Sequence, residues 1–171
     1  ATMFGLDHKS GVEITENDPM ISDQSPEQSA MGQGTHSFAN VQLARYVTAM
    51  ANRGTVFELS VIDKVTDSQG NLVEDYTPKI SSHINIQEST WNTVQNGMRR
   101  VIQYGSANKL FRELKVNVAG KTGTAQESKT RGNHAFFISF APFEAPQVAV
   151  TVNIPFGYSS SNAASVAKEI Y

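Results

Sequence analysis

The most constraining feature of this sequence is the run QVAVTVNIP, residues 147–155, in which large aliphatic residues occupy every second position. Successive side chains of a β-strand point to opposite faces of its sheet, so this spacing predicts a strand with one apolar face. Residues 115–127 and 134–142 predict two more strands, joined by short, turn-rich links that favour an antiparallel meander. The aliphatic residues of the first run are Val148, Val150, Val152 and Ile154.

Two longer segments have the periodicity of amphipathic helices. In residues 40–54, apolar side chains recur at i, i+1, i+4, i+7 and i+8, and Gly54 predicts the C-terminal end. The apolar stripe of the second segment stops at Gly105, and Asn85 with Glu88 predicts a capping arrangement at its start. The stripes are Leu43, Ala44, Val47, Met50 and Ala51, and Trp91, Val94, Met98, Val101 and Ile102.

The remaining patterns complete the predicted fold. A third helix is predicted to begin with Asn162 in a capping position and to pack on one face of the sheet. Two short runs on either side of residues 67–71 predict a surface β-hairpin, and residues 10–34 predict an extended loop. Together these patterns predict an α+β fold, a mainly antiparallel sheet flanked by helices. The residues predicted to be buried by the third helix are Ala164, Val166, Ala167 and Ile170.

Charge and composition narrow the classes of partner. The 14 Lys and Arg residues against 16 Asp and Glu leave a net charge of −2, which provides no basic field for nucleic acid. The absence of cysteine excludes disulfides, zinc sites with thiolate ligands and a cysteine nucleophile. His8, His36 and His83 are widely spaced, and neither a metal site nor a cofactor is predicted.

The chain has the sequence properties of a fragment. No run of apolar residues approaches the roughly 18 that a membrane-spanning helix requires, and the first residues lack the regions of a signal peptide. The chain begins with alanine and ends within the third predicted helix. We therefore expect a piece of a longer protein, whose membrane anchor lies outside residues 1–171.

The sequence GKTGT, residues 120–124, is open to two chemical interpretations. A phosphate-binding loop needs the pattern G-x-x-x-x-G-K-[ST] ahead of a helix. Here Lys115 stands where the first glycine belongs, and no helical pattern follows. The alternative is a strand that forms one wall of an acyl-transfer site.

An edge strand could offer the motif's side chains and its backbone to one groove. Gly123 lacks a Cβ, so another backbone can lie close to it, as an added peptide strand would. Lys121 can hold a carboxylate or polarise a hydroxyl, while threonine hydroxyls and a free backbone N–H can bind anionic oxygens. The tetrapeptide alone is equally consistent with an exposed strand that has no chemical role.

The residues around this motif make it more specific. The segment AGKTGTAQ resembles the K-T-G motif of class B penicillin-binding proteins, the peptidoglycan D,D-transpeptidases. SAMGQG followed by VQLARYVTAMANRG resembles the family's GQG element and its helix, and NHAFFISFAP resembles its aromatic strand. VIQYGSA stands where the family carries a glycine-threonine-alanine turn. The resemblance spans nearly the whole chain and implies a fold like that of penicillin-binding proteins and serine β-lactamases.

The resemblance implies acyl transfer on peptidoglycan stem peptides that end in D-Ala-D-Ala, with β-lactams as mimics of that end. By motif position, Lys121 would bind the serine of a separate S-x-N motif and help to tune the nucleophile. Thr122 and Thr124 would bind the terminal carboxylate of the substrate, and Gly123 would permit close docking of a peptide. The backbone N–H of Thr124 would form half of the oxyanion hole.

The motifs that supply the nucleophile in this family, S-x-x-K and S-x-N, do not occur in order before Gly120. Residues 106–109 spell S-x-x-K and residues 160–162 spell S-x-N, but their positions predict helix caps. We therefore expect residues 1–171 to be part of a transpeptidase domain that lacks its upstream half and its nucleophile, and to be inactive alone. The resemblance places the parent at the extracytoplasmic face of the bacterial cell membrane.

Two other functions stay open at this point. The parent could be a β-lactam-sensing or β-lactamase-like relative, or a peptidoglycan-binding module that uses the same groove without chemistry. Among the other polar residues, His134 is predicted to be structural or to line the groove, and Gln33 to shape the connection before the first helix. The aromatic residues predicted to be core are Trp91, Phe136, Phe137 and Phe140.

Overall fold

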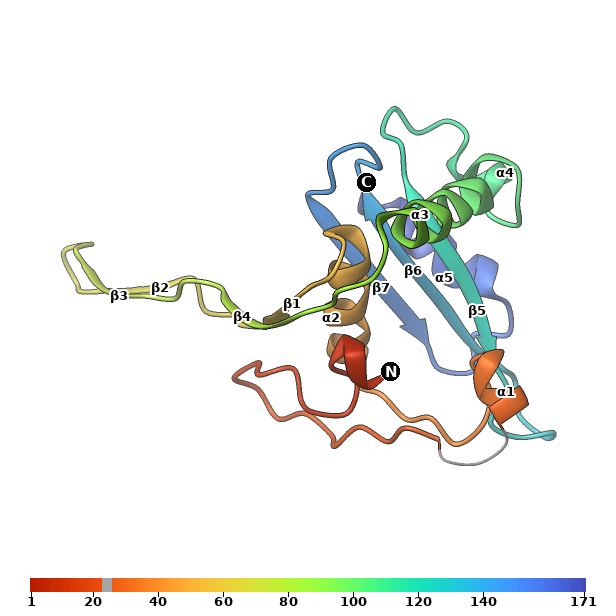
Figure 1. Ribbon diagram of the computed structural model, residues 1–171, viewed down its shortest axis with the longest axis horizontal. Helices are drawn as coiled ribbons and strands as arrows, with labels where there is room; N and C mark the ends of the chain where they lie inside the picture. Colours follow the sequence, from red (N-terminus) through yellow and green to blue (C-terminus); the bar gives the residue numbers. More distant parts are fainter. Residues whose placement is uncertain (23–25) are drawn as a thin grey trace.

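A computed structural model describes residues 1–22 and 26–171 (Figure 1). Its centre is a sheet of antiparallel strands β5 (Ala119–Ala125), β6 (His134–Ala141) and β7 (Val148–Ile154), hydrogen-bonded in the order β5-β6-β7. The predicted α+β class and the antiparallel meander are confirmed. The first strand begins later than the sequence predicts.

The loop predicted over residues 10–34 is mostly irregular. Residues 23–25 of it lie outside the described residues, and the short helix α1 (Pro26–Ala30) interrupts it. An isolated antiparallel bridge joins Met20, within this loop, to Ser37, shortly after it. The short 3-10 helix η1 (Thr2–Phe4) precedes this loop.

One face of the sheet is covered by α2 (Asn40–Ala51) and α3 (Glu88–Gln103), and α3 lies in front of the sheet in Figure 1. Phe140 is fully buried beneath these helices, in a cluster that also contains Trp91. Both helices fall within the segments that periodicity predicts. The sequence therefore predicts both helices correctly, and the structure assigns them to one face of the sheet.

Gln95 of α3 is buried and faces α2, whereas the sequence predicts that its neighbour Val94 is buried. The buried face of α3 is therefore turned slightly from the predicted one. Nε2 of Gln95 donates to the carbonyl oxygens of Met50, at 2.8 Å, and Ala51, at 3.2 Å. Carbonyls in the last turn of a helix lack partners within that helix, so a buried amide can satisfy them. Val94, which the sequence predicts to be buried, is 41% exposed.

The N-cap residues of two helices differ from the predicted ones, and the N-cap of α3 makes no side-chain cap hydrogen bond. The N-cap of α3 is Gln87, and Asn85 lies outside the helix. Helix α5 (Ser160–Lys168) is capped by Ser159, whose Oγ accepts a backbone N–H of the first turn. Asn162 lies within that turn, where its Nδ2 donates to a carbonyl of the preceding loop at 2.8 Å. The predicted residues have side chains that can cap a helix, but the helices begin at other residues nearby, which therefore occupy the N-cap positions.

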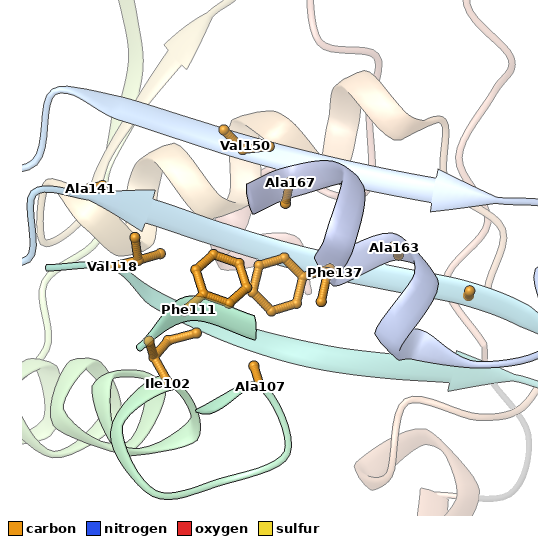
Figure 2. Close-up of a cluster of buried hydrophobic side chains, with 11 residues drawn as sticks. Ile102, Ala107, Phe111, Val118, Phe137, Ala141, Val150, Ala163 and Ala167 are labelled. Carbon is orange, nitrogen blue, oxygen red and sulfur yellow. The ribbon is translucent and has the colours of Figure 1, made fainter. Parts of the chain in front are cut away.

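The other face of the sheet is covered by α5 and the short helix α4 (Asn108–Phe111) (Figure 2). The rings of Phe111 and Phe137 are stacked there, with centroids 5.4 Å apart. Ala163 and Ala167 of α5 are fully buried in the same cluster, and their small side chains let the helix approach the sheet. Two larger residues predicted to be buried are exposed, namely Val166 (47%) and Ile170 (57%).

A long antiparallel ribbon extends away from the sheet and its helices (Figure 1). Strands β1 (Thr55–Glu58) and β4 (Lys79–His83) pair near the body of the protein. Strands β2 (Lys64–Thr66) and β3 (Leu72–Asp75) pair beyond them. The predicted hairpin is confirmed, and it forms the far end of a longer ribbon.

Arg45 of α2 is buried and joins the N-terminal segment to this helix. Its Nη1 donates to the carbonyl oxygen of Lys9 and its Nη2 to that of His8, both at 2.8 Å, and Nη2 also donates to Gly5. Burial lowers the pKa of Arg45, and the nearby charge of Glu16 opposes that shift. Periodicity does not reveal this contact, because an arginine on a helix is ordinarily exposed.

Replacing Arg45 by methionine is expected to lower the free energy of unfolding by about 2–3 kcal/mol, because three backbone carbonyls, one of them buried, lose the donor that the guanidinium supplies. Urea unfolding of the full-length protein measures this loss. Arg100, an exposed arginine of α3, provides the matched control, and Arg100→Met should change stability by less than about 0.5 kcal/mol. Equal effects of the two substitutions would contradict the role given to Arg45.

Candidate active site

β5 is an outer strand of the central sheet, and among the described residues it pairs with β6 alone. The GKTGT motif, residues 120–124, occupies most of this strand. It therefore lies along an open edge of the sheet (Figure 1). Its place on a strand, rather than ahead of a helix, contradicts the phosphate-loop interpretation.

Two backbone carbonyls of the motif point away from β6, toward the open edge. The carbonyl oxygen of Thr122 accepts from Nζ of Lys121 at 2.6 Å, and that of Thr124 accepts from Nε2 of Gln33 at 3.0 Å. In an antiparallel strand the N–H and C=O of one residue point to the same side. The N–H groups of Thr122 and Thr124 therefore point to the open edge as well.

The side chains of the motif divide between the two faces of the sheet, as strand alternation predicts. The register with β6 places Lys121 and Gly123 on the face covered by α2 and α3. It places Thr122 and Thr124 on the face covered by α5. The four predicted site residues thus lie together at one strand edge, and the role of each stays a prediction.

The two glycines of the motif meet different constraints. A Cβ at Gly120 would lie 2.6 Å from Cζ of Phe137 and 2.9 Å from the carbonyl oxygen of Ile138, so glycine alone fits there. A Cβ at Gly123 would meet one described atom within 4 Å, the Cβ of Phe136 at 3.2 Å. Gly123 therefore leaves space beside the strand, as close docking of a peptide requires.

Ser106 lies in the turn between α3 and α4, and its Oγ is 3.1 Å from Oγ1 of Thr122. The N-cap of α4 is Ala107, and the helix has no side-chain cap. The predicted capping role of Ser106 is therefore wrong. Its hydroxyl faces β5 because the strand passes beside this turn, a proximity that local sequence does not encode.

Gln33 contacts the far end of the same edge. It stands between Gly32 and Gly34, whose φ angles are 75° and 105°, and its side chain reaches the carbonyl of Thr124. The sequence predicts mainly a loop-shaping role for this residue. A long amide between two glycines was the available signal, since such a loop can turn tightly and extend one side chain.

His134 begins β6 and takes part in structural contacts. Its Nε2 lies 3.0 Å from Oε2 of Glu127, and its Nδ1 accepts the N–H of Phe156 at 3.3 Å. These contacts support the predicted structural role over that of a general base. Within residues 1–22 and 26–171, no group of three or more His, Asp or Glu side chains is arranged to hold a metal ion.

A family model for the penicillin binding protein transpeptidase domain matches residues 1–171. The chain belongs to the penicillin-binding protein transpeptidase family. One relative in this family is the peptidoglycan D,D-transpeptidase MrdA of Haemophilus influenzae. It is 30% identical over 159 residues, which cover 82% of this chain and 24% of the relative. The chain therefore spans about a quarter of that relative's length.

Two solved penicillin-binding proteins share this fold. Penicillin-binding protein 2B from Streptococcus pneumoniae superposes with a TM-score of 0.85 at 23% identity, over 99% of this chain and 30% of that chain. Penicillin-binding protein A from M. tuberculosis, solved as an imipenem acyl-enzyme complex, gives a TM-score of 0.88 at 20% identity, over 99% and 39%. These superpositions confirm the fold of a penicillin-binding transpeptidase domain.

Proposed function

We propose that this chain is the substrate-binding part of a peptidoglycan D,D-transpeptidase, whose intact form cross-links stem peptides through an acyl-serine intermediate. The open edge of β5 carries the proposal, because the backbone N–H of Thr124 points outward there beside Lys121 and Thr122. Membership of the transpeptidase family supports it. The activity named for the relative MrdA agrees with it.

An extended peptide docked along β5 would bring its terminal carboxylate to the motif. The hydroxyls of Thr122 and Thr124 can donate to that carboxylate, and such charge-assisted hydrogen bonds are about twice as strong as neutral ones. Gly123 leaves room for the peptide backbone at the strand edge. Because β-lactams carry a carboxylate beside a reactive amide, they would dock in the same way.

The N–H of Thr124 would stabilise the negative charge that develops on the scissile carbonyl oxygen. In acyl-transfer enzymes one such donor contributes on the order of 100- to 1000-fold to the rate. Lys121 would bind the serine of an S-x-N motif and help to tune the nucleophile. We propose that this motif and the nucleophilic serine of S-x-x-K lie in the upstream half of the domain, outside residues 1–171.

We place the parent at the extracytoplasmic face of the bacterial membrane, because its proposed substrate, peptidoglycan, is there. No helix in the described parts of this chain combines the length and the apolar composition needed to cross a bilayer. We propose that the anchor belongs to the N-terminal part of the parent. The proposed partners are stem peptides ending in D-Ala-D-Ala, and β-lactams.

Labelling with a fluorescent penicillin tests this function. The full-length parent is expected to form a covalent adduct on a denaturing gel, and residues 1–171 alone are expected to form none. Labelling of residues 1–171 would contradict the proposed absence of a nucleophile and would implicate Ser106. Reversible binding without an adduct by the full-length protein would indicate a peptidoglycan-binding module instead.

The lifetime of the adduct separates a transpeptidase from a β-lactamase-like relative. A transpeptidase should keep its penicilloyl group after excess penicillin is removed. Rapid loss of the label, with repeated turnover to hydrolysed penicillin, would show that a base activates the deacylating water. That result would contradict the proposed transpeptidase function and would indicate a protein that hydrolyses penicillin.

A further inference from the structure

The turn after α3 presents a hydroxyl to the substrate edge. Oγ of Ser106 lies 3.1 Å from Oγ1 of Thr122, although the two residues belong to different elements of the fold. Ser106 is exposed and Thr122 is half-buried, so the pair lies at the surface beside β5. A ligand at this edge could therefore meet a hydroxyl that is already paired.

The backbone that carries Ser106 is held on both sides. An added Cβ on Gly105 would lie 2.8 Å from Cα of Val101, and the N–H of Gly105 donates to the carbonyl of Arg100 at 3.0 Å. Ala107 is 1% exposed, and its N–H donates to the carbonyl of Val101 at 3.3 Å. The turn therefore fixes the place from which Ser106 reaches β5.

The direction of the hydrogen bond follows from the chemistry of the substrate. A carboxylate accepts hydrogen bonds and donates none, so Thr122 must give its single O–H to it. Thr122 is then left as the acceptor toward Ser106, and Ser106 must be the donor. Donation from Ser106 polarises the O–H of Thr122 and strengthens the bond that Thr122 makes to the carboxylate.

We propose that Ser106 is a positioning residue for Thr122, which holds Oγ1 of Thr122 in one rotamer and directs its O–H to the substrate carboxylate. The inference rests on the proposed function, in which Thr122 binds that carboxylate. The χ1 angle of a threonine is restricted, but more than one staggered rotamer remains accessible to it. A hydrogen bond from Ser106, whose backbone position is fixed, would favour one of these rotamers of Thr122. Ser106 itself takes no part in bond making or breaking.

Ser106→Ala in the full-length protein tests the proposal. The second-order rate constant for acylation by benzylpenicillin is expected to fall about three- to tenfold, the scale of one lost hydrogen bond. The loss should appear in the dissociation constant of the initial complex rather than in the acylation step. Ser106→Thr keeps the hydroxyl and should restore most of the rate, while Ser68→Ala, in the exposed turn of the ribbon, should have no effect.

A double-mutant cycle separates positioning from a general effect on folding. Thr122→Val is expected to slow acylation more than Ser106→Ala does, and adding Ser106→Ala to it should have no further effect. With the methyl ester of benzylpenicillin, which lacks the free carboxylate, Ser106→Ala should leave the rate unchanged. Additive losses in the cycle, or an equal loss with the ester, would overturn the proposal.

The same variants show whether a negative result contradicts only the role of Ser106 or also the proposed function. If Thr122→Val slows acylation and Ser106→Ala does not, Ser106 has no positioning role and the carboxylate site on β5 stands. If Thr122→Val leaves acylation unchanged, Thr122 does not bind the carboxylate and the role of Ser106 fails with it, whereas a full-length wild type that forms no adduct overturns the proposed function. Equal midpoints of thermal unfolding for the variants and the wild type show that folding is intact.

Discussion

Replacing Lys121 by alanine in the full-length protein is expected to slow acylation by penicillin by about 100-fold or more, the scale of a lost acid–base group. Lys121 is the one charged residue of GKTGT, and its Nζ already reaches the open edge of β5, where it donates to Thr122 at 2.6 Å. Alanine removes the ammonium group that would tune the nucleophile. The time course of labelling with a fluorescent penicillin measures the rate.

Lys64→Ala provides the control for the loss of a lysine from an exposed strand. Lys64 lies on β2, in the ribbon that extends away from the central sheet, and its replacement should leave the rate unchanged. A thermal melt of both variants shows whether the domain is folded. Labelling of Lys121→Ala at the wild-type rate would refute the role given to this lysine.

Replacing Phe137 by alanine is expected to lower the free energy of unfolding by about 3–5 kcal/mol, the usual cost of removing a buried phenylalanine. Its side chain is 0% exposed and stacks on Phe111, beneath the alanines of α5 (Figure 2). The loss leaves a cavity between the sheet and α5 that small side chains cannot fill. Urea unfolding of the full-length protein gives the measurement.

Phe156→Ala is the matched control for this core substitution. Phe156 lies after β7 and is 40% exposed, so its removal should cost less than about 1 kcal/mol. Losses of similar size in the two variants would contradict the assignment of Phe137 to the core. Phe137→Ala should also slow acylation, because the ring supports β5 at Gly120, directly before Lys121.

Periodicity predicts the elements of this fold well, because burial repeats along a strand or a helix. Alternation in residues 147–155 gives a strand, and the stripes after Asn40 and before Gly105 give helices. Periodicity does not predict the burial of polar residues that are buried by tertiary contacts. Arg45 and Gln95 are buried because they satisfy backbone carbonyls of other segments, and no local pattern records those partners.

In the candidate site, too, the sequence predicts the strand that carries the motif, but not the residues that contact this strand from other parts of the chain. The sequence places Lys121 and its neighbours on a strand, and the structure puts that strand at an open edge. Ser106, 16 residues before Thr122, and Gln33, 91 residues before Thr124, contact the strand from two separate turns. Ser106 has no sequence signature, because ordinary turns use serine, and the glycines on either side of Gln33 indicate a tight turn without identifying the strand it contacts.

The open edge of β5 also bears on self-association. A strand edge that accepts an extended peptide can equally accept a strand from another copy of the chain, which is how sheets join and aggregate. A charged lysine on such an edge opposes that joining, because a second sheet would have to bury the charge. Lys121 is exposed at this position. Lys121→Ala is therefore expected to make the protein more prone to aggregate, besides slowing its acylation.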